Sequence, residues 1–315
     1  MRQITLTPRL RLIADILADN SVKIKYDTAD NHTSQPHTNN TVDTVRTLDT
    51  AKTFADIGTD HGYLPYVLMC EGKIDRAYLC DINQGPLDNA AHTFAGSPFT
   101  EHIEYRLGSG LSVLAPGEAK MIAIAGMGGS LIQSLLEASP AVFQSADYVV
   151  LQPMTEQAAL RSWLVQKGIA FTDYFAAEGN KMYEVIAIDL GATHVTPKES
   201  SDHTQSQQST HAHYTISQAD TSERIEKSSF TDASIMVADM LGTNMVDADM
   251  LEFGHCIAKQ TLPDYHRFLH KKKLKYEKIL NGLKRSNNVL ESACHACHQN
   301  LEAITCIIKY VDGVI

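Results

Sequence analysis

The chain has 315 residues, of which 43% are hydrophobic, a formal net charge of −10 and six cysteines. This length accommodates one large α/β domain with a smaller appendage, and the absence of any run of 18 or more apolar residues argues against a membrane-spanning helix. The first residues lack the apolar stretch of a signal peptide, and the cysteines do not follow a secreted disulfide pattern, so we expect a protein of the reducing cytoplasm.

The acidic charge is unevenly distributed along the chain. Residues 258–315 contain ten Lys and Arg against five Asp and Glu, so this segment is basic while the remainder is strongly acidic. A basic end on an acidic body can still bind phosphate groups locally.

Two polar segments divide the chain. A helix is expected over residues 7–20, where Thr7 can cap and Pro8 suits the first helical position. Residues 27–50 and 193–232 are nearly free of large apolar side chains and are interpreted as insertions or linkers. The expected organisation is a domain over 1–192 that contains the insertion 27–50, a polar linker over 193–232, and a C-terminal unit over 233–315.

Strand-like and helix-like runs alternate between the two polar segments. Short apolar runs over 53–57, 77–81, 121–125 and 148–151 predict strands, and residues 131–138 and 157–167 have helical character. This alternation predicts an α/β fold with a doubly wound, mostly parallel sheet. Residues 183–188 predict a late strand, which could form an antiparallel edge.

The C-terminal unit carries two heptad seams on either side of residues 286–288. The first seam comprises Leu262, Tyr265, Leu269, Lys272, Tyr276, Ile279 and Leu283. The second comprises Leu290, Cys294, Cys297, Leu301, Ile304, Ile308 and Val311. The spacing predicts two antiparallel helices in a coiled-coil-like hairpin.

A glycine-containing loop follows the first predicted strand. It reads Asp56-Ile57-Gly58-Thr59-Asp60-His61-Gly62, which is not the dinucleotide pattern G-x-G-x-x-G. Glycines let a backbone turn tightly beside a ligand, although a plain turn is the alternative. The two carboxylates Asp56 and Asp60 would repel a pyrophosphate but suit the ammonium group of a sulfonium amino acid, which favours S-adenosylmethionine over NAD.

Four further motifs follow later strands. Asp81 closes the second strand at the spacing of a ribose-binding carboxylate, and Gly108-Ser109 could lie against an adenine ring. The sequence Gly126-Met127-Gly128-Gly129 should border the reaction site, because it stands where a strand ends. Gln152 could pair with a base edge. Ordinary turns and helix caps are the alternatives for all four.

The Cys294-His295-Ala296-Cys297-His298 tract resembles a metal site, but both cysteines occupy heptad core positions and no second ligand pair lies nearby, so we expect no metal. The basic run that ends with Lys271, Lys272, Lys273 and Lys275 can neutralise phosphates, as can Arg9 and Arg11 of the first helix. A solvated helix face is the alternative.

Together these residues resemble the bacterial tRNA (adenine-22-N1)-methyltransferases, the TrmK-type family. The resemblance is carried above all by the string from Asp56 to His61 and by Ala125-Gly126-Met127-Gly128-Gly129, with further matches from Arg9 to the helical hairpin. Ser109 stands where relatives tend to carry Asp, and Asp81 where some carry Glu.

This resemblance implies a class I methyltransferase fold, S-adenosylmethionine as donor with S-adenosylhomocysteine as product, and tRNA held in part by the hairpin. The donor is expected along a set of residues in three loops: Asp56, Gly58, Asp60, His61, Asp81, Gly108, Ser109, Gly126 and Met127. The reaction is expected at Asp60, Gly126, Gly128 and Gln152, with Tyr63 or Tyr183 stacked on the base. Phosphates are expected over Arg9, Arg11, Lys271, Lys272, Lys273 and Lys275.

Three other functions remain open at this stage. A methyltransferase acting on a small molecule or protein would not need the basic hairpin. An NAD-dependent oxidoreductase would need the missing glycine pattern. A non-catalytic RNA-binding protein could retain the same fold. We expect a monomer with no obligate protein partner and no membrane attachment, because heptad seams within one chain can pair internally.

Overall fold

The computed structural model describes residues 3–26, 51–191, 251–254, 261–285 and 291–313. Both polar insertions, 27–50 and 193–232, and the domain boundaries predicted near residue 192 fall outside these ranges. Within the described ranges, no helix is long and apolar enough to cross a membrane.

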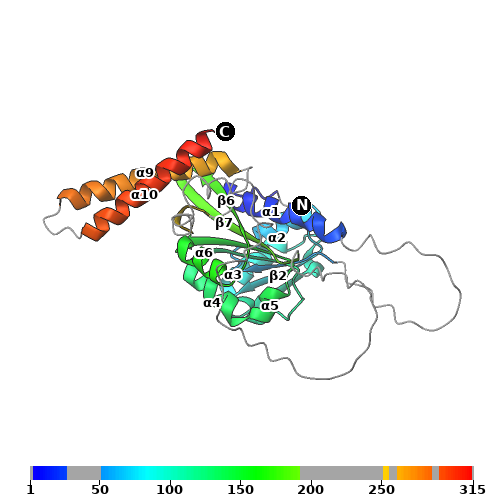
Figure 1. The fold of residues 1–315 in the computed structure, drawn as a ribbon. Coiled ribbons are helices and arrows are strands. Elements are labelled where there is room, and N and C mark those ends of the chain that lie inside the picture. Colours follow the sequence, from blue (N-terminus) through cyan, green and yellow to red (C-terminus); the bar gives the residue numbers. More distant parts are fainter. Residues whose placement is uncertain (1–2, 27–50, 192–250, 255–260, 286–290, 314–315) are drawn as a thin grey trace, which may run out of the picture.

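A seven-stranded sheet forms the centre of the molecule, in the order β3-β2-β1-β4-β5-β7-β6 (Figure 1). The strands are β1 (Thr53–Ile57), β2 (Arg76–Asp81), β3 (Ile103–Leu107), β4 (Met121–Gly128), β5 (Tyr148–Thr155), β6 (Thr172–Glu178) and β7 (Lys181–Asp189). The first five are parallel to one another, whereas β7 runs antiparallel to both β5 and β6. The predicted doubly wound α/β fold is confirmed.

Helices cover both faces of the sheet. On one face lie α1 (Pro8–Tyr26), α2 (Tyr63–Cys70) and α3 (Gln84–Phe94), whose apolar side chains share a core with alternate residues of the central strands, among them Phe54 and Leu79. On the other lie α4 (Gly129–Ala138), α5 (Pro140–Gln144) and α6 (Gln157–Gln166), which share a second core with Ile57 and Ile124. The alternation of side chains along each strand directs successive residues to opposite cores, so both faces of the central strands are buried.

The prediction that residues 183–188 form the sheet edge is wrong. The strand is antiparallel as expected, but β6 pairs along its outer side and is itself the edge. The sequence did not predict β6, because its charged residue Asp173 is fully buried instead of facing water, where a polar residue of a strand is expected.

Two other boundaries differ from the predictions. Gly126 to Gly128 belong to β4, beyond a register irregularity at Ala125–Met127, rather than to a loop after it. Gln152 likewise lies within β5. Such irregularities occur next to active sites, where they change the direction of a strand.

The predicted helical hairpin is present as α9 (Leu262–Arg285) and α10 (Glu291–Asp312), which lie side by side and project from the sheet (Figure 1). In its second seam, Cys297, Ile304, Ile308 and Val311 are buried and Cys294 and Leu301 are half-buried, whereas Leu290 lies outside the described residues. On α9, however, Ile279 is exposed and Leu280 is buried. A straight helix drifts from a strict heptad over this length, because it has 3.6 rather than 3.5 residues per turn.

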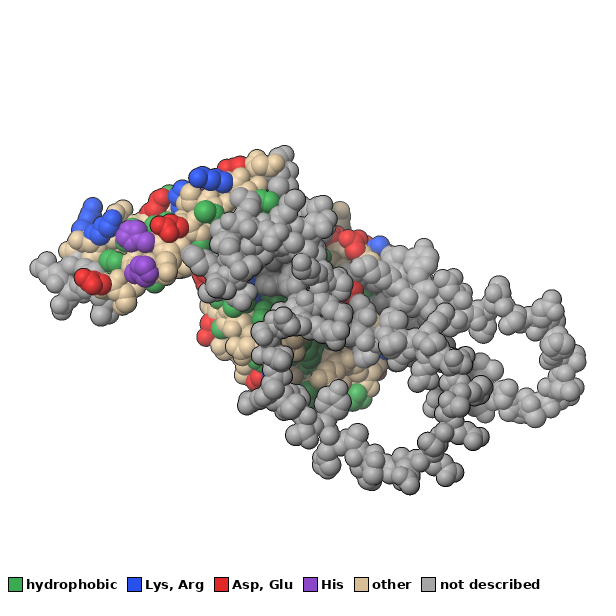
Figure 2. Space-filling view, in the orientation of Figure 1, with side chains coloured by type: hydrophobic (Ala, Val, Ile, Leu, Met, Phe, Trp, Pro, Cys, Tyr) green, Lys and Arg blue, Asp and Glu red, His purple; other side chains and the backbone are tan. Residues whose placement is uncertain are grey.

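The hairpin carries charges of both signs on its surface. Figure 2 shows Lys and Arg side chains over its outward part, with acidic and histidine side chains between them. In this view they do not form a continuous basic face.

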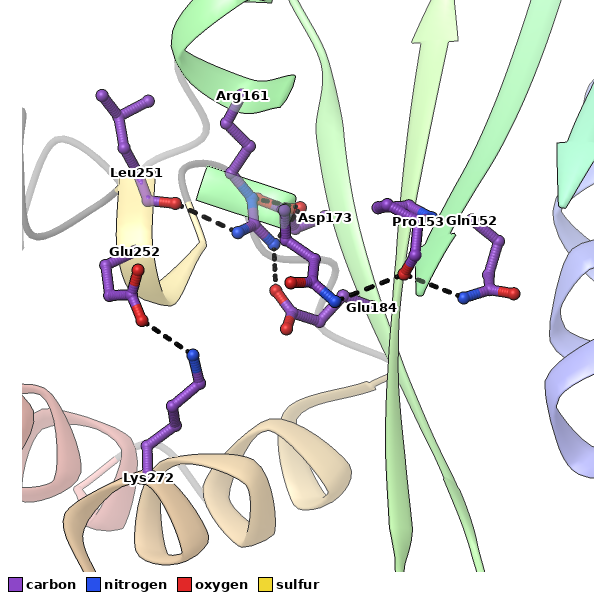
Figure 3. Close-up of polar contacts among 9 residues, drawn as sticks. Gln152, Pro153, Arg161, Asp173, Glu184, Leu251, Glu252 and Lys272 are labelled. Atoms are coloured by element: carbon purple, nitrogen blue, oxygen red, sulfur yellow. Dashed lines mark hydrogen bonds and ion pairs between the residues drawn. The ribbon is translucent and has the colours of Figure 1, made fainter. Parts of the chain in front are cut away.

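The root of the hairpin is held to the sheet by a buried ionic cluster (Figure 3). Arg161 of α6 has no exposed surface and bonds Asp173 of β6 at 3.1 Å and Glu184 of β7 at 2.6 Å. Its third partner is the carbonyl oxygen of Leu251, at 3.1 Å. The next residue, Glu252, accepts a hydrogen bond from Lys272 of α9 at 2.8 Å, so residues 251–253 link the sheet to the hairpin.

Candidate active site

The loop that follows β1 meets the last residues of β4 at the carboxyl ends of the parallel strands, which we call the carboxyl edge. Gly58 has a φ of +78° and its amide nitrogen donates to the carbonyl of Cys80 at 2.8 Å. A Cβ atom at Gly58 would lie 2.2 Å from the methyl group of Met127. The two motifs that carry the family resemblance are therefore in contact, and the absence of a side chain at Gly58 permits that contact.

Asp56 and Asp81 are the acidic residues at the ends of neighbouring strands. Burial raises the pKa of Asp56 to about 6, and the nearby charge of Asp81 adds to the effect. Asp81 is half-exposed, and its carboxylate accepts a hydrogen bond from the backbone nitrogen of Asn83 at 2.7 Å. Asp56 is thus a buried carboxyl group that gains from a cationic partner.

Asp60, His61 and Tyr63 form an exposed rim beside Gly58. The Asp60 side chain is 74% exposed and lies 3.3 Å from the His61 ring nitrogen. The His61 and Tyr63 rings stack with centroids 5.0 Å apart. Exposed stacked rings offer a flat surface on which a base can stack.

Two exposed apolar residues lie at the ends of β2 and β3, and sequence reasoning missed one of them, Ile82. Ile82 and Leu107 are 66% and 57% exposed, and Leu107 pairs with Asp81 in the sheet. Gly108 and Ser109 follow directly, and the Gly108 amide donates to the Asp81 carbonyl at 2.9 Å. Exposed apolar side chains next to the strand-end carboxylate of Asp81 could contact an aromatic ring, but single exposed apolar residues give no such signal in a sequence.

Gln152 holds several elements together. It has no exposed surface, and its Oε1 accepts hydrogen bonds from Arg9 at 2.8 Å and from the Gly126 amide at 3.2 Å. Its Nε2 donates to the carbonyl of Pro153 at 3.0 Å. The Arg9 guanidinium also lies over the Tyr183 ring, 5.5 Å from its centroid. Gln152 thus fixes the backbone beside Gly126 instead of projecting from the edge.

A second unpredicted residue, Glu156, supports the end of β4. It is the one described non-glycine residue with a positive φ, at 58°. Its backbone oxygen would lie 2.5 Å from a Cβ at Gly129. Position 129 therefore requires a glycine, because another segment of backbone passes close to it. The glycine motif predicted a close approach by a ligand, but the group that approaches is the Glu156 backbone of the same chain.

The residues expected to bind phosphate fall into two groups. Arg11 pairs with Glu71 at 2.6 Å and with Asp15 at 2.7 Å, and these contacts raise its pKa. Lys271 donates to the carbonyl of Asn180, and Lys272 to Glu252. Lys273 is half-buried and Lys275 exposed, and neither has an ion pair within the described ranges.

Of the described cysteines of the C-terminal unit, Cys297 behaves as a core residue, whereas Cys294 is half-buried and Cys306 is exposed. Cys297 is buried, and its thiol donates to the carbonyl of Tyr276. Within the part of the chain that the structure describes, no group of three or more His, Cys, Asp or Glu could hold a metal ion.

Comparison with known proteins shows which proteins this chain is similar to. Residues 38–186 match the family model described as a methyltransferase domain. This matched stretch is a little under half of the chain. The strand order and flanking helices agree with the Rossmann-like methyltransferase fold, so the predicted class I fold is confirmed.

One curated relative and two solved structures are similar to this chain. The tRNA (adenine(22)-N(1))-methyltransferase of Bacillus subtilis (strain 168) is 38% identical over 138 residues, which cover 44% of this chain and 58% of the relative. The matched stretch thus spans less than two thirds of that relative's length.

The B. subtilis M1A22 tRNA methyltransferase TrmK superposes with a TM-score of 0.62 at 20% identity, covering 97% of this chain and 100% of that chain. Streptococcus pneumoniae Sp1610 in complex with S-adenosyl-L-methionine superposes with a TM-score of 0.60 at 21% identity, covering 96% of this chain and 100% of that chain. The resemblance inferred from the motifs is confirmed.

Proposed function

We propose that the protein transfers a methyl group from S-adenosylmethionine to N1 of the adenine at position 22 of tRNA. The observation that carries this proposal is the contact between Gly58 and Met127, which joins the two family-specific strings at the carboxyl edge of a methyltransferase domain. The 38% identity over 138 residues to a tRNA (adenine(22)-N(1))-methyltransferase also supports the proposal.

The residues at the carboxyl edge fit the donor. The terminal methyl group of Met127 fills the space that a Cβ would take at Gly58, so the loop after β1 packs directly against the end of β4 at the proposed donor site. The buried carboxyl of Asp56 can pair with the amino group of the donor, Asp81 with its ribose, and Ile82 and Leu107 with its adenine. Gly108 and Ser109 would border that ring.

S-Adenosylmethionine supplies an electrophilic methyl group on a sulfonium, and S-adenosylhomocysteine is the product. Adenine N1 has a free lone pair, so its attack needs no general base. The protein must then align the acceptor with the donor. Gly126 presents exposed backbone at that position, and Gln152 holds the Gly126 amide in place. Gly128 follows it, with its Cβ position facing the Thr155 side chain.

The protein must also stabilise the positive charge that develops on the base, because N1-methyladenine is cationic. Asp60 stands at the rim, where its carboxylate favours positive charge that develops nearby. Its effect is screened while it faces water and grows when bound RNA excludes water. His61 and Tyr63 offer the stacking surface for a base taken out of its helix.

The hairpin is proposed to hold tRNA through Lys273 and Lys275, the two lysines of the predicted phosphate-binding set that have no partner within the described ranges. Lys271 and Lys272 are assigned to docking of the hairpin, because both bond residues outside it. The proposed division is donor binding by residues 1–192 and tRNA binding by 233–315, in a monomer without an obligate protein partner. A tRNA acceptor also places the activity in the cytoplasm.

The test is methylation of unmodified tRNA transcripts with labelled donor, followed by nucleoside mass spectrometry. We expect 1-methyladenosine that disappears when the adenine at position 22 is replaced by guanine. Another methylated nucleoside would retain the fold and donor but overturn the acceptor. Binding of S-adenosylhomocysteine without transfer to any tRNA would favour a small-molecule or protein acceptor, and binding of tRNA alone would favour a non-catalytic role.

A further inference from the structure

Arg9 is a cation that the fold fixes at the carboxyl edge without an anionic partner. Its Nη1 donates to the Gln152 Oε1 at 2.8 Å, and its guanidinium lies over the Tyr183 ring. Within the described ranges it forms no ion pair, whereas Arg11 on the same helix is paired with two carboxylates. Both groups that hold Arg9 are neutral, so its charge is not compensated.

The anchor of Arg9 is rigid. Gln152 has no exposed surface, and both of its side-chain polar atoms are engaged. A guanidinium has five N–H donors, and the Gln152 bond uses one of them. The side chain is therefore held in one orientation while donors remain for a ligand, an arrangement suited to binding a phosphate.

The neighbouring backbone leaves room for that ligand. Gly126 is exposed with a φ of +80°, and a Cβ built there would find one described atom within 4 Å, Nη1 of Arg9 at 4.0 Å. The cation thus borders the position at which the acceptor base is placed in the proposed reaction. Any nucleotide that brings its base to Gly126 brings a phosphate on the attached sugar.

We propose that Arg9 is a positioning residue that holds the phosphate of the acceptor nucleotide while its base lies beside Gly126. This inference rests on the proposed function and adds the group that places the acceptor. The phosphate also has an electrostatic effect. An uncompensated guanidinium would oppose the positive charge that develops on the methylated base, and the bound phosphate neutralises it.

The experiment compares Arg9→Ala, Arg9→Lys and the matched control Arg11→Ala in steady-state methylation of tRNA. We expect Arg9→Ala to lower kcat/KM by about 10- to 100-fold, as for loss of a charged hydrogen bond. Arg9→Lys keeps the charge but not the planar guanidinium, so its kcat/KM should lie between those of Arg9→Ala and the parent protein. Arg11→Ala should stay within about threefold of the parent protein. The affinity for S-adenosylhomocysteine, measured by calorimetry, should not change in any variant.

A second measurement separates phosphate binding from a structural role. A tRNA is assembled with a neutral methylphosphonate on the 5′ or the 3′ side of the acceptor adenosine. The parent protein should lose about tenfold in kcat/KM at one of these two positions, and Arg9→Ala should lose little more there. Gln152→Glu, which gives Arg9 a carboxylate partner, should reproduce the insensitivity of Arg9→Ala with the arginine still present.

Equal penalties from the methylphosphonates in the parent protein and in Arg9→Ala would overturn the assignment of Arg9 while leaving the methyltransferase activity intact. Loss of S-adenosylhomocysteine binding in Arg9→Ala would also overturn it, because the defect would then lie in the fold. Failure of the parent protein to methylate tRNA would instead overturn the proposed function, and this inference with it.

Discussion

Tyr183 and Glu184 are consecutive residues of β7 that face opposite sides of the sheet and hold different parts of the molecule. Tyr183 lies under the Arg9 guanidinium, on the side that α1 covers. Glu184 bonds Arg161 on the side where residues 251–253 and α9 dock. The β6–β7 ribbon thus connects the N-terminal helix and the root of the hairpin beside the carboxyl edge.

The buried Arg161 cluster should be the most sensitive ionic site of the described fold. Arg161→Met would leave Asp173 and Glu184 buried without their cation. Breaking a buried pair in this way costs about 3–5 kcal/mol in the free energy of unfolding. Urea denaturation measures the loss. The control is Arg267→Met, whose pair with Asp264 is exposed and should contribute less than about 1 kcal/mol. Similar losses in both variants would contradict the role of the cluster.

Asp56 should stabilise the bound donor at the expense of the free protein. Its folded pKa of about 6 lies above the ordinary value of 3.8, so the folded state favours the proton. The contribution of this group to stability is therefore complete below pH 4 and is lost as the pH rises through 6. Asp56→Asn should raise the free energy of unfolding at pH 8 by up to about 3 kcal/mol, with no gain near pH 4.

The same substitution should weaken donor binding, because the ammonium group would lose its carboxylate partner. Calorimetry with S-adenosylhomocysteine at pH 8 measures this loss, and denaturation at both pH values measures the gain. A stability difference that is equal at pH 4 and pH 8 would show that burial of the charge is not its cause.

Gly58 should matter for the donor beyond its backbone conformation. Gly58→Ala and Gly72→Ala both place a side chain at a positive φ, of 78° and 64°, and each should cost about 1–2 kcal/mol of stability. A Cβ at Gly72 meets no described atom within 4 Å, whereas at Gly58 it meets Met127. We expect a loss of S-adenosylhomocysteine affinity in Gly58→Ala alone. Equal affinities in the two variants would remove the Gly58–Met127 contact from the donor site.

Sequence patterns correctly predicted those elements whose burial depends on the local spacing of apolar residues. The strands at 53–57 and 77–81 and the hairpin were predicted because apolar periodicity reflects burial directly. The strand β6 was missed because its buried Asp173 is compensated by Arg161, twelve residues earlier in the chain. The residues around Asp173 in the sequence do not show that an ionic partner lies twelve positions away.

The candidate site divides in the same way. The glycine loops were identified from their spacing, because tight turns have local signatures. The role of Gln152 was not, because its partner Arg9 lies 143 residues away. Arg9 and Arg11 are equivalent in the sequence, and the tertiary structure distinguishes them by pairing Arg11 with Glu71.

The hairpin lysines should separate into two classes by their effect on tRNA and on stability. Lys273→Glu with Lys275→Glu should weaken tRNA binding and lower the slope of log affinity against log salt by about one to two, because two phosphate contacts are lost. Lys272→Glu should mainly lower thermal stability, because Lys272 pairs with Glu252 and lies over the Phe268 ring.

Filter binding across a salt series and thermal denaturation measure the two effects. An unchanged salt slope in the double variant would remove this face of α9 from the tRNA contact. The opposite pattern, a lower slope in Lys272→Glu at unchanged stability, would mean that Glu252 releases Lys272 to the RNA.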